Sequence, residues 1–192
     1  MLTDRHPSSL VFVTVTPTPP TPLEGLARAL AVLVERDERL DVAWHADGHA
    51  VELGGADDEH LEQVLDALKR AFSVTAATSR PRVDLKRARV DRIDGQAWVD
   101  IEPWMDVEVQ ARPFYVPRLR DAWPRLRQST HLDSTTSLVI LRCRAPLAEV
   151  FGLRRAVYDM THGEASATVV LWGYAPRDED DEPGAPVRTS RR

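Results

Sequence analysis

The chain of 192 residues is poor in cysteine and lysine: it holds one cysteine, Cys143, and two lysines, Lys69 and Lys86. A single cysteine excludes a disulfide within the chain, and its alternation with apolar neighbours is typical of a strand residue in a reducing compartment. No apolar run approaches the roughly 18 residues that a membrane helix needs, and no charged segment followed by an apolar one opens the chain. We therefore expect a cytoplasmic protein without a membrane segment.

Signatures of catalysis are also lacking. The sequence has no Gly-x-x-x-x-Gly-Lys-Ser/Thr loop, which would cradle the phosphates of a nucleotide, so we expect no GTP hydrolysis by these residues. His45, Asp47 and His49 surround a predicted hairpin tip but lack a fourth metal ligand. His60 has no identifiable nucleophile or paired acid beside it, as a catalytic base would need. We expect no enzyme activity, no metal and no cofactor, and no small-molecule substrate is identifiable.

The charge that is present is unevenly distributed. The net charge is -7 over residues 1–79, +3 over residues 80–176 and -1 over residues 177–192, and nearly all the cations are arginines. Arginine is the better bidentate partner of phosphate, although a bias in genome composition explains the same preference. Only the second half could favour nucleic acid.

Hydrophobic periodicity predicts the same element order twice. In the first half we expect strands at 10–16, 40–44, 50–53 and 74–77, with helices at 23–36 and from Asp57 or Asp58 to Phe72. In the second half we expect strands at 105–111, 130–135, 138–145 and 166–174, with helices at 115–127 and 147–160, the first kinked or broken at Pro124. The prediction is an α+β chain of two tandem ferredoxin-like (βαββαβ) domains.

The expected boundaries follow from this order. They are a first domain at 9–79, a linker at 80–101, a second domain at 102–176 and a tail at 177–192. The linker contains two possible strand segments separated by Asp94-Gly95, and we interpret it as ordered. Residues 1–8 are expected to fray, and the tail, with five consecutive acidic residues, has nothing to bury and is expected to be disordered.

Three motifs in the second half carry a resemblance. They are Glu-Pro-Trp-Met-Asp-Val-Glu-Val at 102–109, Pro-Leu-Ala-Glu-Val-Phe-Gly at 146–152 and Thr-His-Gly at 161–163. They resemble the last domain of elongation factor G, a domain that is itself ferredoxin-like. Ribosomal-protection relatives of that factor share the layout, and a resemblance to them is a near alternative.

The first half resembles the third domain of the same factor through a weaker set of phrases in family order. These include Val15-Thr16-Pro17, His60-Leu61-Glu62 and the run from Leu68 to Val74. The resemblance therefore covers the third and fifth domains only, and the GTPase domain and the fourth domain have no counterpart. Translocation by the family mechanism is not expected of this chain alone.

Polar positions depart from the family pattern more than apolar ones. Glu164 stands where the family has an arginine after the final helix, and Leu126 stands where the family has one of two arginines. The first departure places an anion at a turn expected near ribosomal RNA. The apolar positions expected in the core match the family better than the polar positions expected to contact RNA.

Candidate contact residues for ribosomal RNA or a protein partner are arginines of the two helices, together with two residues of the final turn. They are Arg118, Arg120, Arg127, Arg154, Arg155, His162 and Gly163. Such a basic face would bind phosphates in a salt-dependent way, and a solvated helix surface is the alternative. His60 is expected at an interdomain contact. The basic run from Arg80 to Arg92 is either a binding segment or a charged linker.

The resemblance implies a non-enzymatic binding module that associates with the ribosome at the translation-factor site. Two alternatives remain: a regulatory module that binds a translational GTPase, and a divergent relic with an unrelated ligand, because the ferredoxin-like fold hosts many functions.

Overall fold

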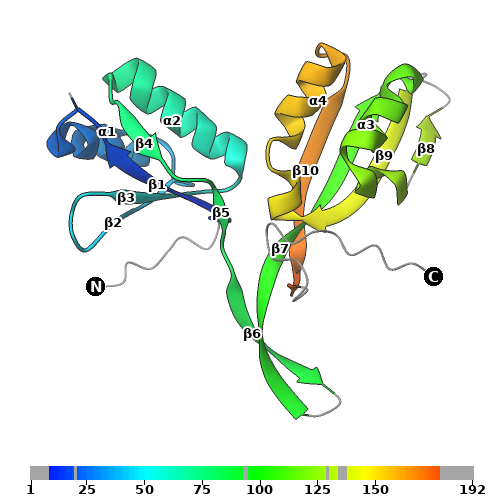
Figure 1. The fold of residues 1–192 in the computed structure, drawn as a ribbon, viewed down its shortest axis with the longest axis horizontal. Helices are drawn as coiled ribbons and strands as arrows, with labels where there is room; N and C mark the ends of the chain where they lie inside the picture. The colour runs from blue at the N-terminus through cyan, green and yellow to red at the C-terminus, as the bar shows by residue number, and fades with distance from the viewer. Residues whose placement is uncertain (1–8, 20, 93–94, 129, 134–137, 178–192) are drawn as a thin grey trace.

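The computed structural model describes residues 9–19, 21–92, 95–128, 130–133 and 138–177. The expected fraying of residues 1–8, the expected disorder of 178–192, Asp94 in the predicted linker turn and residues 134–135 of the predicted strand lie outside the described residues. The described part forms two units, each with its own antiparallel sheet (Figure 1).

The first unit follows the predicted βαββαβ order. Its elements are β1 (Val11–Pro17), α1 (Leu23–Arg36), β2 (Asp41–Trp44), β3 (Val51–Gly55), α2 (Asp58–Phe72) and β4 (Ala76–Thr78). The strands lie in the order β2-β3-β1-β4, and the short β5 (Arg82–Val83) also pairs with β1. The chain thus places β1 and β3 at the centre of the sheet, beneath α1 and α2.

The second unit repeats this topology. Its elements are β6 (Lys86–Arg92), β7 (Gly95–Ala111), η1 (Pro113–Tyr115), α3 (Val116–Ala122), η2 (Pro124–Gln128), β8 (Thr130–Asp133), β9 (Leu138–Pro146), η3 (Leu147–Val150), α4 (Leu153–Thr161) and β10 (Ser166–Pro176). The sheet order is β10-β7-β9-β8, which matches β4-β1-β3-β2 of the first unit position for position. The predicted fold class is confirmed.

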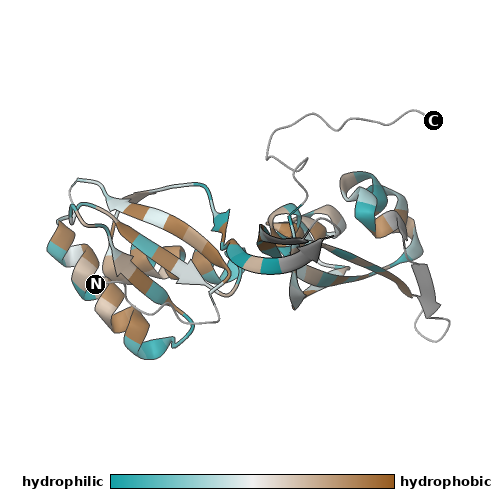
Figure 2. Cartoon of the chain, turned by 90° about the horizontal axis from the view of Figure 1, so that it is seen from below, coloured by the Kyte–Doolittle hydropathy of each residue, from teal (hydrophilic) through white to brown (hydrophobic). Residues whose placement is uncertain are grey.

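Apolar stripes at helical spacing hold each layer together. In the first unit Leu26 and Leu30 of α1 and Leu61 and Leu68 of α2 are buried against the sheet, where Val11, Val13 and Val15 point inward. Burying each such side chain contributes about 1.5–3 kcal/mol. Figure 2 shows brown apolar segments alternating with teal segments along these helices and strands. The periodicity that predicted the elements is the one that builds the core.

Both helical segments of the second unit are interrupted. The predicted break at Pro124 is confirmed: α3 ends at Ala122, Trp123 is extended with φ -127° and ψ 93°, and Pro124 begins η2. The predicted continuous helix at 147–160 is wrong, because η3 and α4 are separated at Phe151 and Gly152. Gly152 adopts the left-handed conformation, with φ 69°, which a continuous helix does not contain.

The predicted linker at 80–101 is built from strands. β6 pairs with the first part of β7 from Lys86 opposite Ile101 to Arg92 opposite Gly95. This two-stranded ribbon extends from the base of the second sheet away from both units (Figure 1). We call β6 and the paired part of β7, 95–101, the arm.

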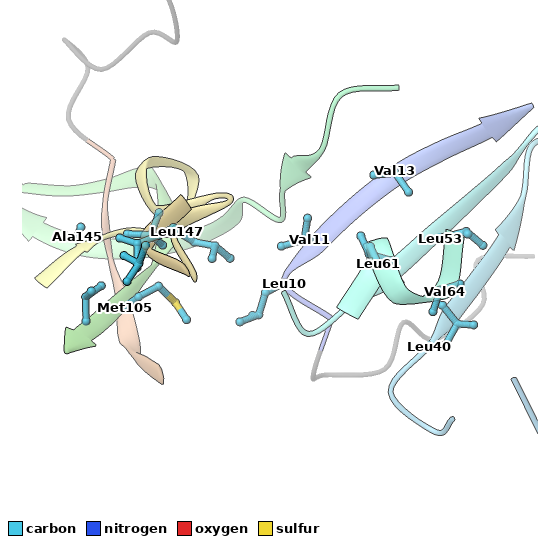
Figure 3. Packing of buried hydrophobic residues seen from close by; sticks show 14 of the residues in the cluster. Leu10, Val11, Val13, Leu40, Leu53, Leu61, Val64, Met105, Ala145 and Leu147 are labelled. Carbon is cyan, nitrogen blue, oxygen red and sulfur yellow. The ribbon is translucent and has the colours of Figure 1, made fainter. Parts of the chain in front are cut away.

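Apolar packing continues from one unit to the other. β5 lies against η3, and the buried residues of both units form one cluster. Figure 3 shows Leu10 and Val11 on the side of the first core that faces Leu147 and Met105. No helix within the described residues has the length and apolar content needed to cross a membrane.

Candidate functional site

The N-termini of α2 and α4 meet between the two units. Asp57 caps α2, where its Oδ1 accepts a hydrogen bond from the backbone N–H of His60 at 2.8 Å. The next residue, Asp58, accepts a hydrogen bond at Oδ2 from the backbone N–H of Gly152, which caps α4. Both helix starts carry partial positive charge, so both stabilise carboxylates placed between them.

Arg154 completes this contact. Its Nη1 lies 3.0 Å from Oδ2 of Asp57 and 2.8 Å from Oε2 of Glu59, and its Nη2 donates to the carbonyl oxygen of Val169 at 3.0 Å. Burial alone would lower the pKa of Arg154, but its hydrogen bonds to Glu59 and Asp57 outweigh burial and raise that pKa above the ordinary value. One guanidinium therefore ties α2 of the first unit to the edge strand β10 of the second. We call Asp57, Asp58, Glu59, Gly152 and Arg154 the interdomain latch.

A cavity of about 430 Å³ opens beside the latch. Its walls carry the charges of α2 and α4, including Glu62 and Arg155, whose Oε2 and Nη1 are 3.6 Å apart. Its floor is apolar, with Leu147, Val150 and Leu153 among the lining side chains. The lining residues come from both units, so the cavity lies at their interface.

His60 lies inside the first unit. Its side chain is 5% exposed, and its Nε2 is 2.7 Å from Oδ2 of Asp37 at the end of α1. Its Nδ1 accepts a hydrogen bond from the backbone N–H of Ala56. The contacts to the second unit come from the neighbours of His60 on α2, and an interdomain role for His60 itself stays a prediction.

The Thr-His-Gly motif closes α4 with a left-handed turn. Thr161 is fully buried; its hydroxyl donates to the carbonyl of Val157 at 2.7 Å and accepts from the backbone N–H of Ala165 at 3.1 Å. His162 and Gly163 have φ values of 53° and 81°. The buried threonine fixes the turn, and the turn presents His162 and Gly163 to solvent.

The anion that departs from the family pattern has a partner beside this turn. Oε2 of Glu164 lies 3.4 Å from Nε of Arg112. Arg118 of α3 donates from Nη1 to the carbonyl of Met160 in the last turn of α4, at 3.4 Å. We call Arg112, Arg118, His162, Gly163 and Glu164 the turn surface, which carries two guanidinium groups and one carboxylate.

The predicted contact residues are thus divided between two places. Arg118, His162 and Gly163 lie together on the turn surface, whereas Arg154 lies in the latch and Arg155 beside it, 75% exposed. Arg120 is half-buried on α3, and Arg127 belongs to η2, its side chain lying outside the described part. A role for any of them in RNA binding remains a proposal.

The residues that sequence reasoning did not assign are the carboxylates of the latch. Asp57, Asp58 and Glu59 complement the dipole of their own helix, and they also contact the second unit. The opposite net charges of the two halves indicate attraction between them, but net charge does not identify which residues form ion pairs. Within the described residues no group of three or more histidines, cysteines, aspartates or glutamates is placed to hold a metal ion. Burial raises the pKa of the Cys143 thiol, which keeps it protonated.

Comparison with known proteins finds a family match for the second unit. Residues 100–183 match the family model of the elongation factor G C-terminus. This part of the chain is similar in sequence to the elongation factor G C-terminus and has the βαββαβ topology described above. The match covers less than half of the chain and begins after the first unit, so the resemblance of residues 9–79 to the third domain stays a prediction.

Individual relatives agree with the family model. Elongation factor G of Anaplasma marginale (strain Florida) is 32% identical over 77 residues, which are 40% of this chain and 11% of that protein. Elongation factor G of Salinibacter ruber is 28% identical over 88 residues, or 46% of this chain and 12% of that protein. The elongation factor G of Pseudothermotoga lettingae is 31% identical over 80 residues. The similarity thus spans about a tenth of the length of each of these relatives.

Proposed function

We propose that this chain is a non-enzymatic, cytoplasmic module that binds the ribosome at the translation-factor site. The observation that carries the proposal is the match of residues 100–183 to the elongation factor G C-terminus. The two units act together in this proposal, because the latch fixes the second unit against the first.

The turn surface is the proposed contact with ribosomal RNA. Arg112 and Arg118 are exposed arginines on either side of an exposed turn, and their guanidinium groups can reach phosphates. Glu164 opposes this contact, but Arg112 lies 3.4 Å from its carboxylate and offsets part of its charge. The proposal therefore predicts binding that is weak and sensitive to salt.

Cosedimentation with ribosomes at increasing salt concentration tests the proposal. Arg112→Glu combined with Arg118→Glu is the variant of choice, because both side chains are exposed members of the turn surface and neither belongs to the latch. The ribosome-bound fraction should fall with salt for the wild type and should fall at low salt for this variant.

Arg28→Glu is the matched control. Arg28 is also an exposed helix residue that donates to a backbone carbonyl at 3.4 Å, but it belongs to α1 of the first unit. The control should sediment like the wild type. Capture of a translational GTPase without ribosomal subunits would instead favour a regulatory module. If Arg28→Glu lowered the ribosome-bound fraction as much as the turn-surface variant does, the loss would be explained by net charge and the proposed contact would be contradicted.

A further inference from the structure

The arm has two chemically different faces. Side chains alternate across a strand, so Lys86, Ala88, Val99 and Ile101 share one face, while Arg87, Arg89, Trp98 and Asp100 share the other. We call Arg87, Arg89, Trp98 and Asp100 the polar face. Figure 1 shows no helix over either face of the arm.

The polar face exposes an indole beside two guanidinium groups. Trp98 is 66% exposed, and Arg89 is its direct partner across the ribbon. Arg87 is 78% exposed, and its Nε lies 3.4 Å from Oδ1 of Asp100. Arg89 is exposed as well, so the face places two guanidinium groups next to an accessible aromatic ring.

Packing within the chain does not account for this arrangement. The apolar side of the arm, with Ala88, Val99 and Ile101 half-buried, is the side that packing would use. Trp98 lies on the opposite side, where water would otherwise cover a large apolar surface. Arg87, Arg89 and Trp98 precede the part of the chain that matches the elongation factor G model, so these three residues of the polar face lie outside that match.

We propose that the polar face of the arm binds a single-stranded segment of RNA. An indole exposed beside arginines offers a stacking platform for an unpaired base and phosphate contacts for the nucleotides next to it. Duplex RNA is a poorer fit, because its major groove is too deep and narrow for side chains to read and its bases are already stacked. The choice of RNA over DNA rests on the proposed function, whereas the recognition of unpaired nucleotides rests on the arm alone.

The test is fluorescence anisotropy of a short, labelled, mixed-sequence oligoribonucleotide with the full chain, at several salt concentrations. Trp98→Ala should weaken binding about tenfold and leave the salt dependence unchanged, because stacking carries no net charge. Arg87→Gln combined with Arg89→Gln should weaken binding at low salt and reduce the slope of log affinity against log salt by about 1.4, the value for two lost phosphate contacts on a single strand.

Arg70→Gln is the matched control for the arginine variants. Arg70 is 79% exposed and pairs with one carboxylate, that of Asp66, as Arg87 does with Asp100, but it lies on α2. It should bind the oligonucleotide like the wild type. Circular dichroism of each variant verifies that the fold is kept.

Three results would overturn the inference: no RNA binding at low salt, arm variants that bind like the wild type, or equal binding of the same sequence as DNA or as an RNA duplex. Ribosome cosedimentation separates this inference from the proposed function. RNA binding through the arm without ribosome association would refute the proposed function but not RNA binding by the arm. Ribosome association together with arm variants that keep wild-type oligonucleotide affinity would refute RNA binding by the arm but not the proposed function.

Discussion

At the scale of single residues, the His60 and Asp37 pair shows how a polar side chain is accommodated in the first unit. The backbone N–H of Ala56 donates to Nδ1 of His60, so the ring hydrogen lies on Nε2 and donates to Asp37. Asp37 also receives two hydrogen bonds from the guanidinium of Arg39, at 3.1 and 3.2 Å. The buried ring is satisfied at both nitrogens, and α2 is thereby joined to the end of α1.

Asp37 gives the first unit an acid-sensitive contribution to stability. The side chain of Arg39 lowers the pKa of Asp37 most; partial burial opposes this, and the backbone N–H of Arg39 and His60 lower it further. Since the folded-state pKa lies well below the ordinary 3.8, the stabilisation is complete above about pH 4 and is lost as the pH falls through the folded-state value. Asp37→Asn should therefore reduce the free energy of unfolding at neutral pH, and urea denaturation should show the difference shrinking below about pH 4. A difference that is independent of pH would contradict this role.

Gly55 is required by packing, as it lies at the end of β3 beneath α2. A Cβ atom added there would lie 2.9 Å from Nδ1 of His60 and 2.9 Å from Cγ of Leu61, both in buried side chains. We expect Gly55→Ala to destabilise the chain by about 1–3 kcal/mol in urea denaturation. Gly25→Ala is the control, since its nearest neighbour is 3.5 Å away and alanine favours the helix. Equal stability of the two variants would rule out the packing argument.

At the scale of elements, the order and the sheet topology could be predicted because alternation marks strands and a spacing of three to four marks helices. Pro124 could be recognised as a break because proline has no N–H to donate. The break at Gly152 was missed because Leu147, Val150, Leu153 and Val157 keep helical spacing across it. Periodicity reports which face is buried, and it does not report whether the backbone between two apolar residues is continuous.

Gly152 allows η3 and α4 to be separate segments. Its φ of 69° is open to glycine and costs an alanine about 1–2 kcal/mol, although an added Cβ would meet no atom within 4 Å. Gly152→Ala should lower the free energy of unfolding by about that amount, and Gly152→Asn should cost less, because asparagine tolerates the left-handed region. Chemical denaturation of both variants measures this, and an unchanged stability for Gly152→Ala would show that the turn adapts.

At the scale of the whole molecule, the relation between the two units could not be predicted. Arg154 and Asp57 are 97 positions apart, and no local pattern links them. The sequence showed an acidic first half and a basic second half, which indicates attraction but not a contact. Arg154 lies on the polar side of an amphipathic helix, and this position predicts an RNA contact. The sequence pattern does not distinguish a polar residue that contacts another unit from one that is exposed to solvent.

The latch should set the angle between the units. Arg154→Met keeps the aliphatic stem and removes the guanidinium, which leaves Asp57 and Glu59 without their partner and frees the carbonyl of Val169. We expect small-angle X-ray scattering to report a larger radius of gyration for this variant. Arg155→Met is its control, because the Arg155 and Glu62 pair is long and exposed and contributes little. Identical scattering curves for the wild type and Arg154→Met would mean that apolar packing alone holds the units.

The central claim, binding at the translation-factor site, is tested most directly by competition on the ribosome. Elongation factor G can be held on ribosomes with a non-hydrolysable GTP analogue, and the labelled chain is then added at low salt. The account predicts that bound elongation factor G excludes the chain and that excess chain reduces factor binding. Simultaneous binding of both proteins, or no binding of the chain to vacant ribosomes, would contradict it.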